Sequence, residues 1–422
     1  MKEELFLKGK SFLITQPMIR SFCGSTMVTL ELAKYLLSAG ARVVVYTNVM
    51  LAPASASFED AGIEVVSPKD DFNFSLKDFD YVWVHSLTIP CQLLDELKYS
   101  HKKMPAFIFL HMSPLDIIPD EHPWIYNLEN ILSTISLYIS EGTLESNKKY
   151  GLPSRVGFFR NPAPLEFQDL IGRKISREIR RLLVVSNHPP TEVIKAKGIL
   201  ADRGIRVDFY GDGQDQYMPL LPAVLKKYDA VITIGKTVQY CIVGSLPVYI
   251  YDWFGGPGWL TASNYEHSKY NNFSGRFSGD KTGEEIAKEI IEGYPDALDF
   301  HMGFLARNNK EFIMDYALDD LLSNLKPRKF DVLDSEYIES VKAAVRCAEI
   351  RFIASEELGN MRDYCKDLVY QIDNYKKQVN KYRKKYDDLA GSKRMKFLDN
   401  ILKPHDIIKD YFTRNIKQQE KK

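Results

Sequence analysis

The sequence predicts an α/β fold of two Rossmann-like domains followed by a C-terminal α-helical extension. At 422 residues the chain is longer than one hydrophobic core usually serves. Short β-rich runs alternate with helical segments in two successive series, and such alternation favours parallel sheets. From about residue 335 the composition changes to charged helix formers without strand candidates. We therefore expect domains over 1–165 and 166–325 and a helical extension over 335–422.

The first series begins with the strand candidate SFLITQ (11–16) and the helical segment STMVTLELAKYLLSAG, which we expect to end at Gly40. The strand candidates ARVVVYTN, GIEVVS, DYVWVHS and AFIFLHMS follow. The prolines of FFRNPAP, near residue 160, favour an extended connection over a continued helix. This connection is the predicted hinge between the two domains.

The second series contains RRLLVVSNHPP, IRVDFYGDG, KYDAVITIGKT and SLPVYIYDWFGGPG. In each of these segments an apolar strand leads into a polar loop that contains glycine or proline. In open parallel sheets, ligands bind at the carboxyl ends of the strands. These loops are therefore candidates for a binding site.

The extension carries large side chains at spacings of three and four, close to a heptad seam over about four heptads. They are Met361, Tyr364, Leu368, Ile372, Tyr375, Val379, Tyr382, Tyr386 and Leu389. The spacing predicts a coiled coil or helical hairpin, and hence a homo-oligomer through the C-terminal helices. An amphipathic helix packed on its own domain is the alternative. Residues 392–412 are both basic and apolar, so they suit either a solvated terminal helix or an anionic membrane surface.

Charge and composition argue against several classes of function. Lysine plus arginine equals aspartate plus glutamate at 56 each, so no overall basic charge favours a nucleic-acid partner. The five cysteines include no C-x-x-C pair, which disfavours both a zinc site and a disulfide framework. No run of apolar residues is long enough for a signal peptide or a membrane span. We expect a cytoplasmic protein, with peripheral contact at the inner membrane face left open.

Two loops are suited to binding an anion. In PMIRSFCGSTM, Gly24 stands before a helix whose first amides and positive end can face a phosphate. In IGKTVQY, Lys236 and Thr237 open another helix after a strand, where they can hold a diphosphate. Neither loop has the G-x-G-x-x-G pattern of dinucleotide sites or the Walker spacing, so oxidoreductase and ATPase activities are disfavoured.

Further candidates for donor binding follow strands of the second series. Gly211 and Gly213 belong to the YGDG turn, which suits either a ligand loop or an ordinary turn. Gly255 and Gly256 in FGGPG allow a ligand to approach the backbone closely. Asn187, in the SNH loop, is placed either to meet donor phosphates or to close the hinge.

Two histidines end strands of the first series, and an arginine lies in a later polar loop. His111, at the end of FIFLH, is the candidate catalytic residue, and His85, at the end of YVWVH, is a candidate for the acceptor pocket. Arg276, in KYNNFSGRF, is a second candidate for that pocket. Each histidine also fits the role of a satisfied core residue, and Arg276 that of a loop residue.

Several of these segments resemble the GT-B fold glycosyltransferases over roughly residues 10–310. SFCGSTMVTLELAKYLLSAGARVVVYT is similar to the family's glycine loop, first helix and second strand, and Asn161 of FFRNPAP stands at the family's hinge asparagine. VDFYGDG and the SLPVYIYD–FGG succession resemble the donor-domain strands. The resemblance is nearest to the large retaining bacterial group that builds polysaccharides and glycolipids (glycosyltransferase family 4-like).

The resemblance implies a hexosyltransferase-like, retaining enzyme that needs no metal and no cofactor besides its donor substrate. A nucleotide sugar, with UDP-sugar favoured, would bind the second domain. The acceptor would be a saccharide or a lipid-linked molecule in bacterial surface polysaccharide or glycoconjugate synthesis. Gly24 would approach donor phosphate or acceptor, and His111 would stand near the reacting sugar.

The chain departs from the family pattern at Tyr240, where members usually carry a glutamate that binds sugar or ribose. Tyr240 therefore remains a candidate for donor binding, but with a hydroxyl group in place of the carboxylate. Lys236 is the cation that we expect to bind the donor diphosphate instead. This departure keeps two alternatives open. One is a non-catalytic GT-B scaffold, and the other is a nucleotide-sugar epimerase, which needs acid–base residues on the sugar ring.

Overall fold

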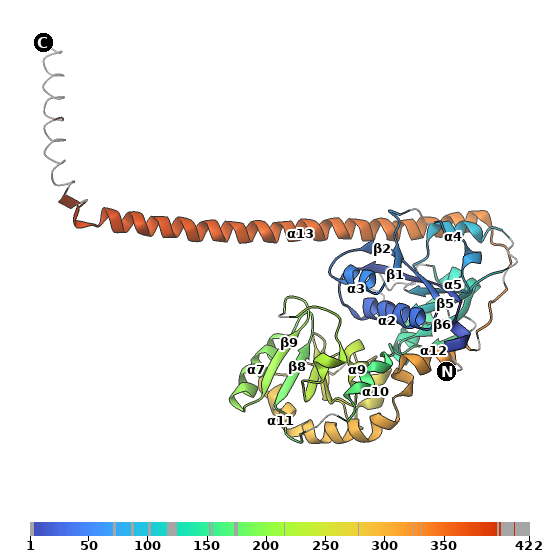
Figure 1. Ribbon diagram of the computed structural model, residues 1–422, viewed down its shortest axis with the longest axis horizontal. Helices are drawn as coiled ribbons and strands as arrows, with labels where there is room; N and C mark the ends of the chain where they lie inside the picture. Colours follow the sequence, from blue (N-terminus) through green and yellow to red (C-terminus); the bar gives the residue numbers. More distant parts are fainter. Residues whose placement is uncertain are drawn as a thin grey trace, which may run out of the picture. The chain divides into compact units, whose positions relative to one another are not determined.

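The computed structural model describes residues 4–397 and 409, except 71–72, 86–87, 100–102, 116–124, 152, 154, 173–175, 215, 277, 324, 330 and 395. The chain divides into two compact units, Met1–Ile353 and Ala354–Lys422. The first unit contains two parallel-rich sheets with helices around them (Figure 1). This architecture confirms the predicted α/β class with two Rossmann-like domains and a helical extension.

The first domain is built on a seven-stranded parallel sheet of order β3-β2-β1-β4-β5-β6-β7. Its strands are β1 Ser11–Ile19, β2 Arg42–Met50, β3 Glu64–Val66, β4 Tyr81–His85, β5 Ala106–His111, β6 Ser133–Tyr138 and β7 Val156–Phe158. Its helices are α1 Glu4–Leu7, α2 Gly24–Ser38, α3 Ala54–Asp60, α4 Cys91–Glu96, α5 Tyr126–Leu132 and α6 Glu141–Asn147. The predicted strands are confirmed. Strands β6 and β7 lie outside the prediction, because the serines and threonine of STISLY interrupt its apolar pattern.

Helices cover both faces of this sheet, as the two separate cores show. Phe12 and Ile14 of β1 face one core with residues of α2 and with Met314, Leu318 and Leu322 of helix α12 (Met314–Leu322). The opposite face packs against α4, α5 and the start of helix α13 (Ser335–Ala390). In Figure 1, α2 and α12 accordingly lie on one side of the sheet and α4 on the other.

The second domain is built on a five-stranded sheet of order β12-β11-β10-β8-β9. Its strands are β8 Arg181–Val185, β9 Arg206–Tyr210, β10 Ala230–Thr233, β11 Val248–Asp252 and β12 Gly255–Trp259. Its helices are α7 Thr191–Asp202, α8 Pro222–Leu225, α9 Lys236–Val243, α10 Tyr265–Tyr270 and α11 Gly283–Phe300. The strands β8 to β11 are predicted from the sequence and confirmed. The FGGPG segment, interpreted there as a ligand loop, instead forms β12, which pairs antiparallel with β11.

The chain crosses between the two domains twice, at neighbouring places. The first crossing is the predicted hinge near residue 160. The second follows the turn Lys310–Phe312, and the two crossings pair where Ala163 N donates to Phe312 O and Met314 N donates to Ala163 O. After this second crossing, α12 joins the core of the first domain, although the sequence places it within 166–325.

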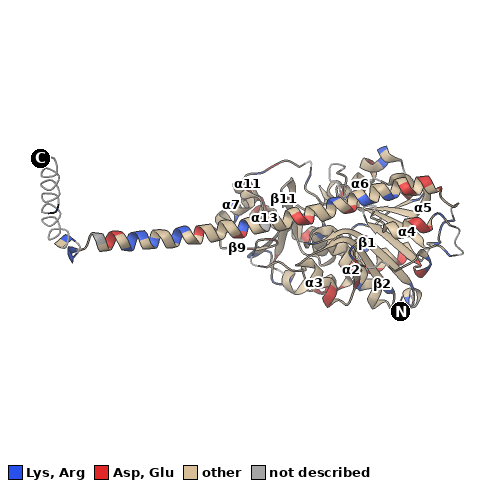
Figure 2. Cartoon of the chain, turned by 90° about the horizontal axis from the view of Figure 1, so that it is seen from above, with Lys and Arg blue, Asp and Glu red and all other residues tan. Residues whose placement is uncertain are grey.

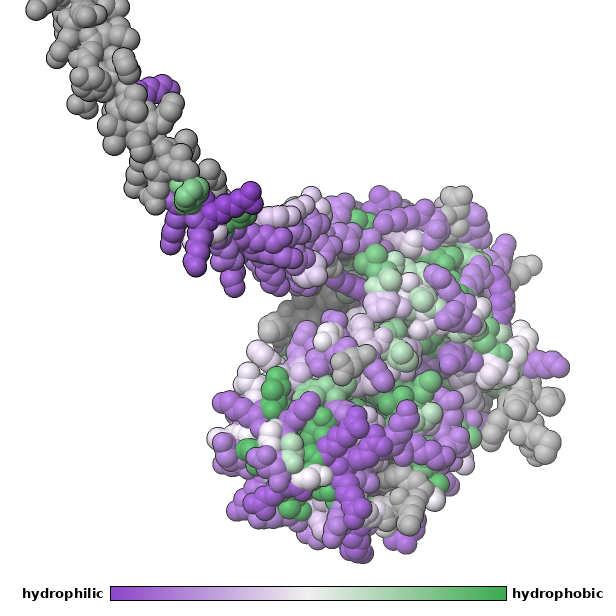
Figure 3. All heavy atoms as spheres, turned by 60° about the vertical axis from the view of Figure 1, so that its left-hand side comes forward, coloured by the Kyte–Doolittle hydropathy of each residue, from purple (hydrophilic) through white to green (hydrophobic). Residues whose placement is uncertain are grey.

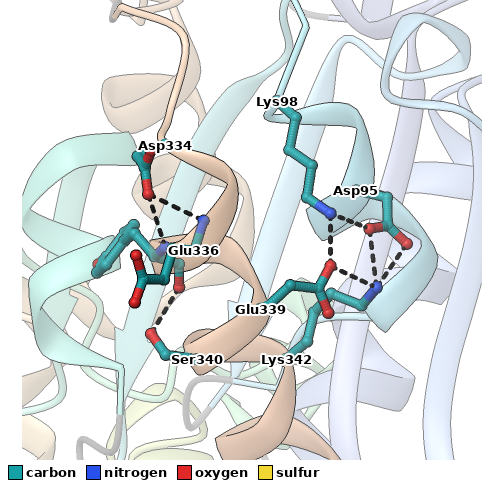
Figure 4. A network of polar contacts seen from close by, with 8 residues as sticks. Asp95, Lys98, Asp334, Glu336, Glu339, Ser340 and Lys342 are labelled. Atoms are coloured by element: carbon teal, nitrogen blue, oxygen red, sulfur yellow. Dashed lines mark hydrogen bonds and ion pairs between the residues drawn. The ribbon is translucent and has the colours of Figure 1, made fainter.

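Helix α13 begins as a well-anchored element of the first unit. Asp334 accepts hydrogen bonds from the first backbone amides, and Ile338, Val341 and Val345 are buried in the core beside α4. Lys342 bridges to Asp95 at 2.8 Å (Figure 4). The predicted C-terminal helix is thus confirmed as far as Ala390. No helix among the described residues is long and apolar enough to cross a membrane, and most of 392–412 lies outside the described part of the chain.

Candidate functional site

A cavity of about 770 Å³ lies between the two domains of the first unit. The first domain contributes the loop before α2 and the residue after β5. The second domain contributes the carboxyl ends of β8, β9, β10 and β11 and the start of α9. The lining residues are Phe22, Cys23, Gly24, Ser25, Met27, Met112, Asn161, Val185, Ser186, Asn187, His188, Tyr210, Gly211, Tyr217, Met218, Leu220, Thr233, Ile234, Gly235, Lys236, Thr237, Tyr240, Asp252, Trp253, Phe254 and Asn272. The two domains therefore face each other across a cleft, as the GT-B prediction requires.

The N-terminal ends of two helices from different domains meet at this cavity. A Cβ atom placed on Gly24, the first residue of α2, would lie 3.7 Å from Cβ of Lys236, the first residue of α9. Each helix end carries backbone amides without intrahelical acceptors and a partial positive charge. Two such ends turned to one space form an environment that favours an anion. The cavity lining brings together Gly24, Lys236 and Thr237, which the sequence analysis placed in two separate loops.

Lys236, however, is engaged within the protein. Its ammonium lies 2.7 Å from Glu31 Oε2 and donates to the backbone oxygens of Asn161, at 3.2 Å, and Pro162, at 2.5 Å. An ammonium has three donors; two of them bond to these backbone oxygens, and the charge is paired with the Glu31 carboxylate in a close ion pair. Lys236 thus ties α9 of the second domain to α2 of the first and to the hinge, and it cannot donate to a diphosphate while it keeps these contacts.

Tyr240 completes this buried tie. Its hydroxyl donates to Glu31 Oε1, and its ring stacks on Phe167 with 4.1 Å between centroids. Burial raises the pKa of Glu31 and lowers the pKa of Lys236, while their mutual attraction opposes both shifts. Tyr240 is thus bonded to a carboxylate of the opposite domain.

Neither histidine is among the lining residues of the cavity. His111 Nε2 lies 2.8 Å from Glu129 Oε1, and the ring stacks on Tyr138. His85 is fully buried, with Nδ1 bonded to Gln16 Oε1 at 3.0 Å. Burial lowers the pKa of His85 to about 3, so this imidazole is neutral at physiological pH. His85 fits a core residue whose Nδ1 is bonded, while its buried Nε2 has no hydrogen-bond partner among the described residues; Met112, next to His111, lines the cavity.

The predicted glycines divide into two groups. Gly211 lines the cavity, and a Cβ there would lie 2.1 Å from the backbone oxygen of Ser186, so the loop requires glycine. Gly213 follows in the same exposed turn and is not a lining residue. A Cβ on Gly255 or Gly256 would lie 2.1 Å or 1.9 Å from a backbone oxygen of its own domain. Backbone crowding around β12 is therefore enough to require glycine at both positions, without a ligand.

Asn187, Thr237 and Arg276 differ in how they relate to the cavity. Asn187 and Thr237 both line it, although Asn187 Oδ1 also accepts a hydrogen bond from the amide of Asp212 at 3.0 Å and so holds the YGDG turn. Arg276 does not line the cavity. Its guanidinium lies 4.5 Å from the ring centre of Phe254, which does, and burial lowers the pKa of Arg276.

A polar group at the end of β11 adds residues that the sequence reasoning does not single out. Asp252 accepts hydrogen bonds from Ser186 Oγ, at 3.0 Å, and from the amide of Trp253, at 2.9 Å. Burial raises the pKa of Asp252, and the Trp253 side chain is 74 % exposed at the cavity. A carboxylate beside an open aromatic ring suits a ligand with hydroxyl groups and a flat face. The signal in the sequence is the Asp-Trp pair that directly follows the apolar run VYIY.

No protein-family model matches the chain, and no curated protein matches its sequence. Among solved structures, a glycosyltransferase from Rickettsia africae ESF-5 is 11 % identical, with 75 % of this chain and 97 % of that chain covered and a TM-score of 0.48. A putative UDP-N-acetylglucosamine 2-epimerase from Listeria monocytogenes is 12 % identical, with coverages of 77 % and 100 % and a TM-score of 0.42. The spinosyn forosaminyltransferase is 12 % identical, with coverages of 75 % and 100 % and a TM-score of 0.43. At TM-scores below 0.5, these likenesses assign neither activity nor substrate to this chain.

Proposed function

We propose that this protein is a glycosyltransferase that moves a sugar from a nucleotide-sugar donor, UDP-sugar by preference, to a saccharide or lipid-linked acceptor. One observation carries the proposal: the starts of α2 and α9, from two facing α/β domains, converge on one 770 Å³ cavity. The volume suits a ligand of nucleotide-sugar size, since ligand cavities commonly span about 300–1,000 Å³. The polysaccharide or glycoconjugate pathway, metal independence and retention of configuration belong to the same proposal, from the family resemblance.

The cavity lining supports a division of roles within the site. The diphosphate would lie against the amides at the starts of α2 and α9, with the hydroxyl groups of Ser25 and Thr237 beside it. The nucleoside would lie toward the second domain, where Asp252 offers an acceptor for hydroxyl groups and Trp253 a stacking surface. The loop around Met112 would face the acceptor side.

The chemistry follows from where negative charge develops. When the bond from the sugar to the diphosphate breaks, charge builds on the leaving phosphate oxygen. Amides already fixed at two helix ends stabilise that charge without reorganisation. Lys236 acts through position, because its ties to Glu31 and to the hinge hold the two helix ends together. His111, held by Glu129, is a positioning residue next to Met112 in this proposal.

Donor binding without transfer is the second candidate, and two observations favour it. The predicted phosphate cation is consumed by internal contacts, and the predicted catalytic histidine is not among the residues that line the cavity. A scaffold of this kind would still bind a nucleotide sugar in the cavity. Binding and turnover therefore have to be measured separately.

The first experiment is thermal unfolding of the full chain against UDP-, GDP- and other nucleotide sugars. A donor present at about 1,000 times its Kd stabilises the folded state by about 4 kcal/mol through mass action. Trp253→Ala should remove most of that shift, because the ring is exposed at the cavity and carries no core packing. Tyr99→Ala is the matched control, since Tyr99 is 67 % exposed and does not line the cavity.

A donor that shifts the melting temperature is then incubated with candidate acceptors, and nucleoside diphosphate and product masses are followed. Release of nucleoside diphosphate together with a glycosylated acceptor supports the transferase. Binding without any change in the donor supports the scaffold. An epimerised donor whose sugar–diphosphate bond is intact supports the epimerase. The absence of a shift with every donor would contradict the nucleotide-sugar site itself.

A further inference from the structure

The second unit carries an apolar stripe along α13. Within Ala354–Ala390, large apolar and aromatic side chains are exposed, from 37 % for Leu368 to 72 % for Tyr386. Hydrophilic residues predominate on the part of α13 visible in Figure 3, so this helix is not apolar all round. A stripe bordered by charge is the pattern of a helix that pairs with another helix.

Strict heptad spacing refines the seam. Starting at Leu358, the positions a and d alternate at steps of three and four residues as far as Leu389. Cys365 then replaces its neighbour Tyr364 at the seam. The a positions are Leu358, Cys365, Ile372, Val379 and Tyr386, and the d positions are Met361, Leu368, Tyr375, Tyr382 and Leu389.

The residue types at these positions favour a parallel two-stranded coil. The β-branched side chains of the seam, Ile372 and Val379, both stand at a, and two of its three leucines, Leu368 and Leu389, stand at d. β-branched residues at a with leucine at d are typical of parallel dimers. The seam tyrosines are amphipathic, so their rings can pack in the seam while their hydroxyl groups reach water.

Charges beside the seam select the same orientation. In a parallel, in-register pair, each g residue faces the e residue five positions later on the other helix. Glu357 then faces Arg362, an attractive pair, and the glutamines Gln371 and Gln378 face cations without repulsion. Figure 2 shows that acidic and basic residues both occur along this helix.

An antiparallel pair would place e residues against e residues. Three of these are the cations Arg362, Lys376 and Arg383, so an antiparallel pair brings like charges together. An antiparallel pair would also set g residues against g residues, and these include Glu357 and Lys385 of opposite sign, so the repulsion comes from the e residues. The seam composition and the charges at e thus favour the parallel arrangement.

We propose that the stripe from Leu358 to Leu389 binds the same stripe of a second copy of this chain, in a parallel, in-register coiled coil that places the two Cys365 side chains opposite each other. Cys365 is a free, exposed thiol in the single chain. In the proposed dimer, its sulfur faces its own counterpart at an a position. The two first units then join the coil at the same end.

The first test is the mass of the full chain by sedimentation velocity over a range of concentrations. The expected mass is twice 48.5 kDa. Tyr375→Lys, at a d position, should weaken association at least about tenfold, because it places two ammonium groups in the seam. Tyr370→Lys is the matched control, since Tyr370 is 69 % exposed on the opposite face and should leave association unchanged. Both tyrosines are exposed in the single chain, and circular dichroism checks that each variant keeps its helix.

The second test is cross-linking of the two thiols, with Cys23→Ser and Cys347→Ser in every variant to remove the other exposed thiols. Diamide takes two electrons and two protons from the two Cys365 thiols and leaves a disulfide between the copies. The expected product is a covalent dimer that reduction reverses and that Cys365→Ser abolishes. A Tyr370→Cys variant that lacks Cys365 should not cross-link.

Several outcomes would overturn the proposal. One is a monomer at every concentration, and another is a dimer that Tyr375→Lys leaves intact. A dimer lost in Tyr375→Lys but not cross-linked through Cys365 would refute the parallel register. A monomer that sediments with phosphatidylglycerol vesicles would assign the stripe to a membrane surface instead.

Discussion

Replacing Lys236 with methionine should destabilise the first unit by about 3–5 kcal/mol, because it leaves Glu31 buried without its cation. The side chains of Lys236 and Glu31 are only 5 % and 8 % exposed, and their charged atoms lie 2.7 Å apart. Methionine keeps much of the length and the apolar stem of lysine. The loss therefore reports the charge interaction more than a cavity.

The double variant Glu31→Gln/Lys236→Met should behave differently. Removing both charges also removes both desolvation costs, so this variant should match the wild type or exceed it by up to about 4 kcal/mol. Glutamine retains an oxygen that accepts the hydrogen bond from Tyr240. The two single variants and the double variant together form a cycle that isolates the coupling between the two side chains.

The pH dependence gives an independent check. Burial raises the pKa of Glu31 above 4.5, so its stabilising contribution is present below pH 4.5 and is lost as pH rises through its folded pKa. Burial lowers the pKa of Lys236 below 10.5, so its contribution is present above pH 10.5 and is lost as pH falls through its folded pKa. Without Lys236, protonation of Glu31 relieves the buried charge. Lys236→Met should therefore be less destabilised at pH 5 than at pH 8.

Urea unfolding, followed by circular dichroism and tryptophan fluorescence, measures these changes in the full chain. A loss of less than about 1 kcal/mol in Lys236→Met, with no difference between pH 5 and pH 8, would refute the buried tie. In that case Lys236 would be free to serve as the phosphate cation that the sequence suggested.

Four further substitutions have expected results of known sign. The pKa of His85 falls from 6.5 to about 3 on folding, so the wild type should lose stability as pH falls from 6.5 toward 3, and His85→Gln should flatten that slope in melting temperature. Gly256→Ala should destabilise the second domain by more than about 3 kcal/mol, because its Cβ would lie 1.9 Å from Ile250 O. Gly198→Ala, in open space on α7, should instead stabilise the protein by about 0.5–1 kcal/mol. Equal urea midpoints for the two variants would contradict this difference. Ile338→Ala should cost about 2–5 kcal/mol, because Ile338 is fully buried where α13 begins, and a loss below 1 kcal/mol would contradict that anchoring.

Local pattern was sufficient for most of the secondary structure. Apolar runs with flanking glycine or proline predicted most strands of both sheets, and helical spacing predicted α2 and α13. Strand β6 was not predicted, because its serines and threonine are polar and are buried only by contacts within the folded sheet. The FGGPG segment was misinterpreted for a related reason. Its glycines fit between backbone groups of β11 and of the loop at Gly279, which the sequence does not place beside them.

By itself, the sequence determined the fold class, the anion-suited helix starts at Gly24 and at Lys236 and Thr237, and the heptad spacing, because all of these follow from local periodicity and from the edge at which parallel strands end. Only the tertiary structure decided that Lys236 is paired with Glu31 and that His111 is not among the residues that line the cavity. The physical reason is that the groups nearest to a charged side chain decide whether it is paired within the protein or available to a ligand. For Lys236 those partners come from α2 and the hinge, segments far from it in the sequence.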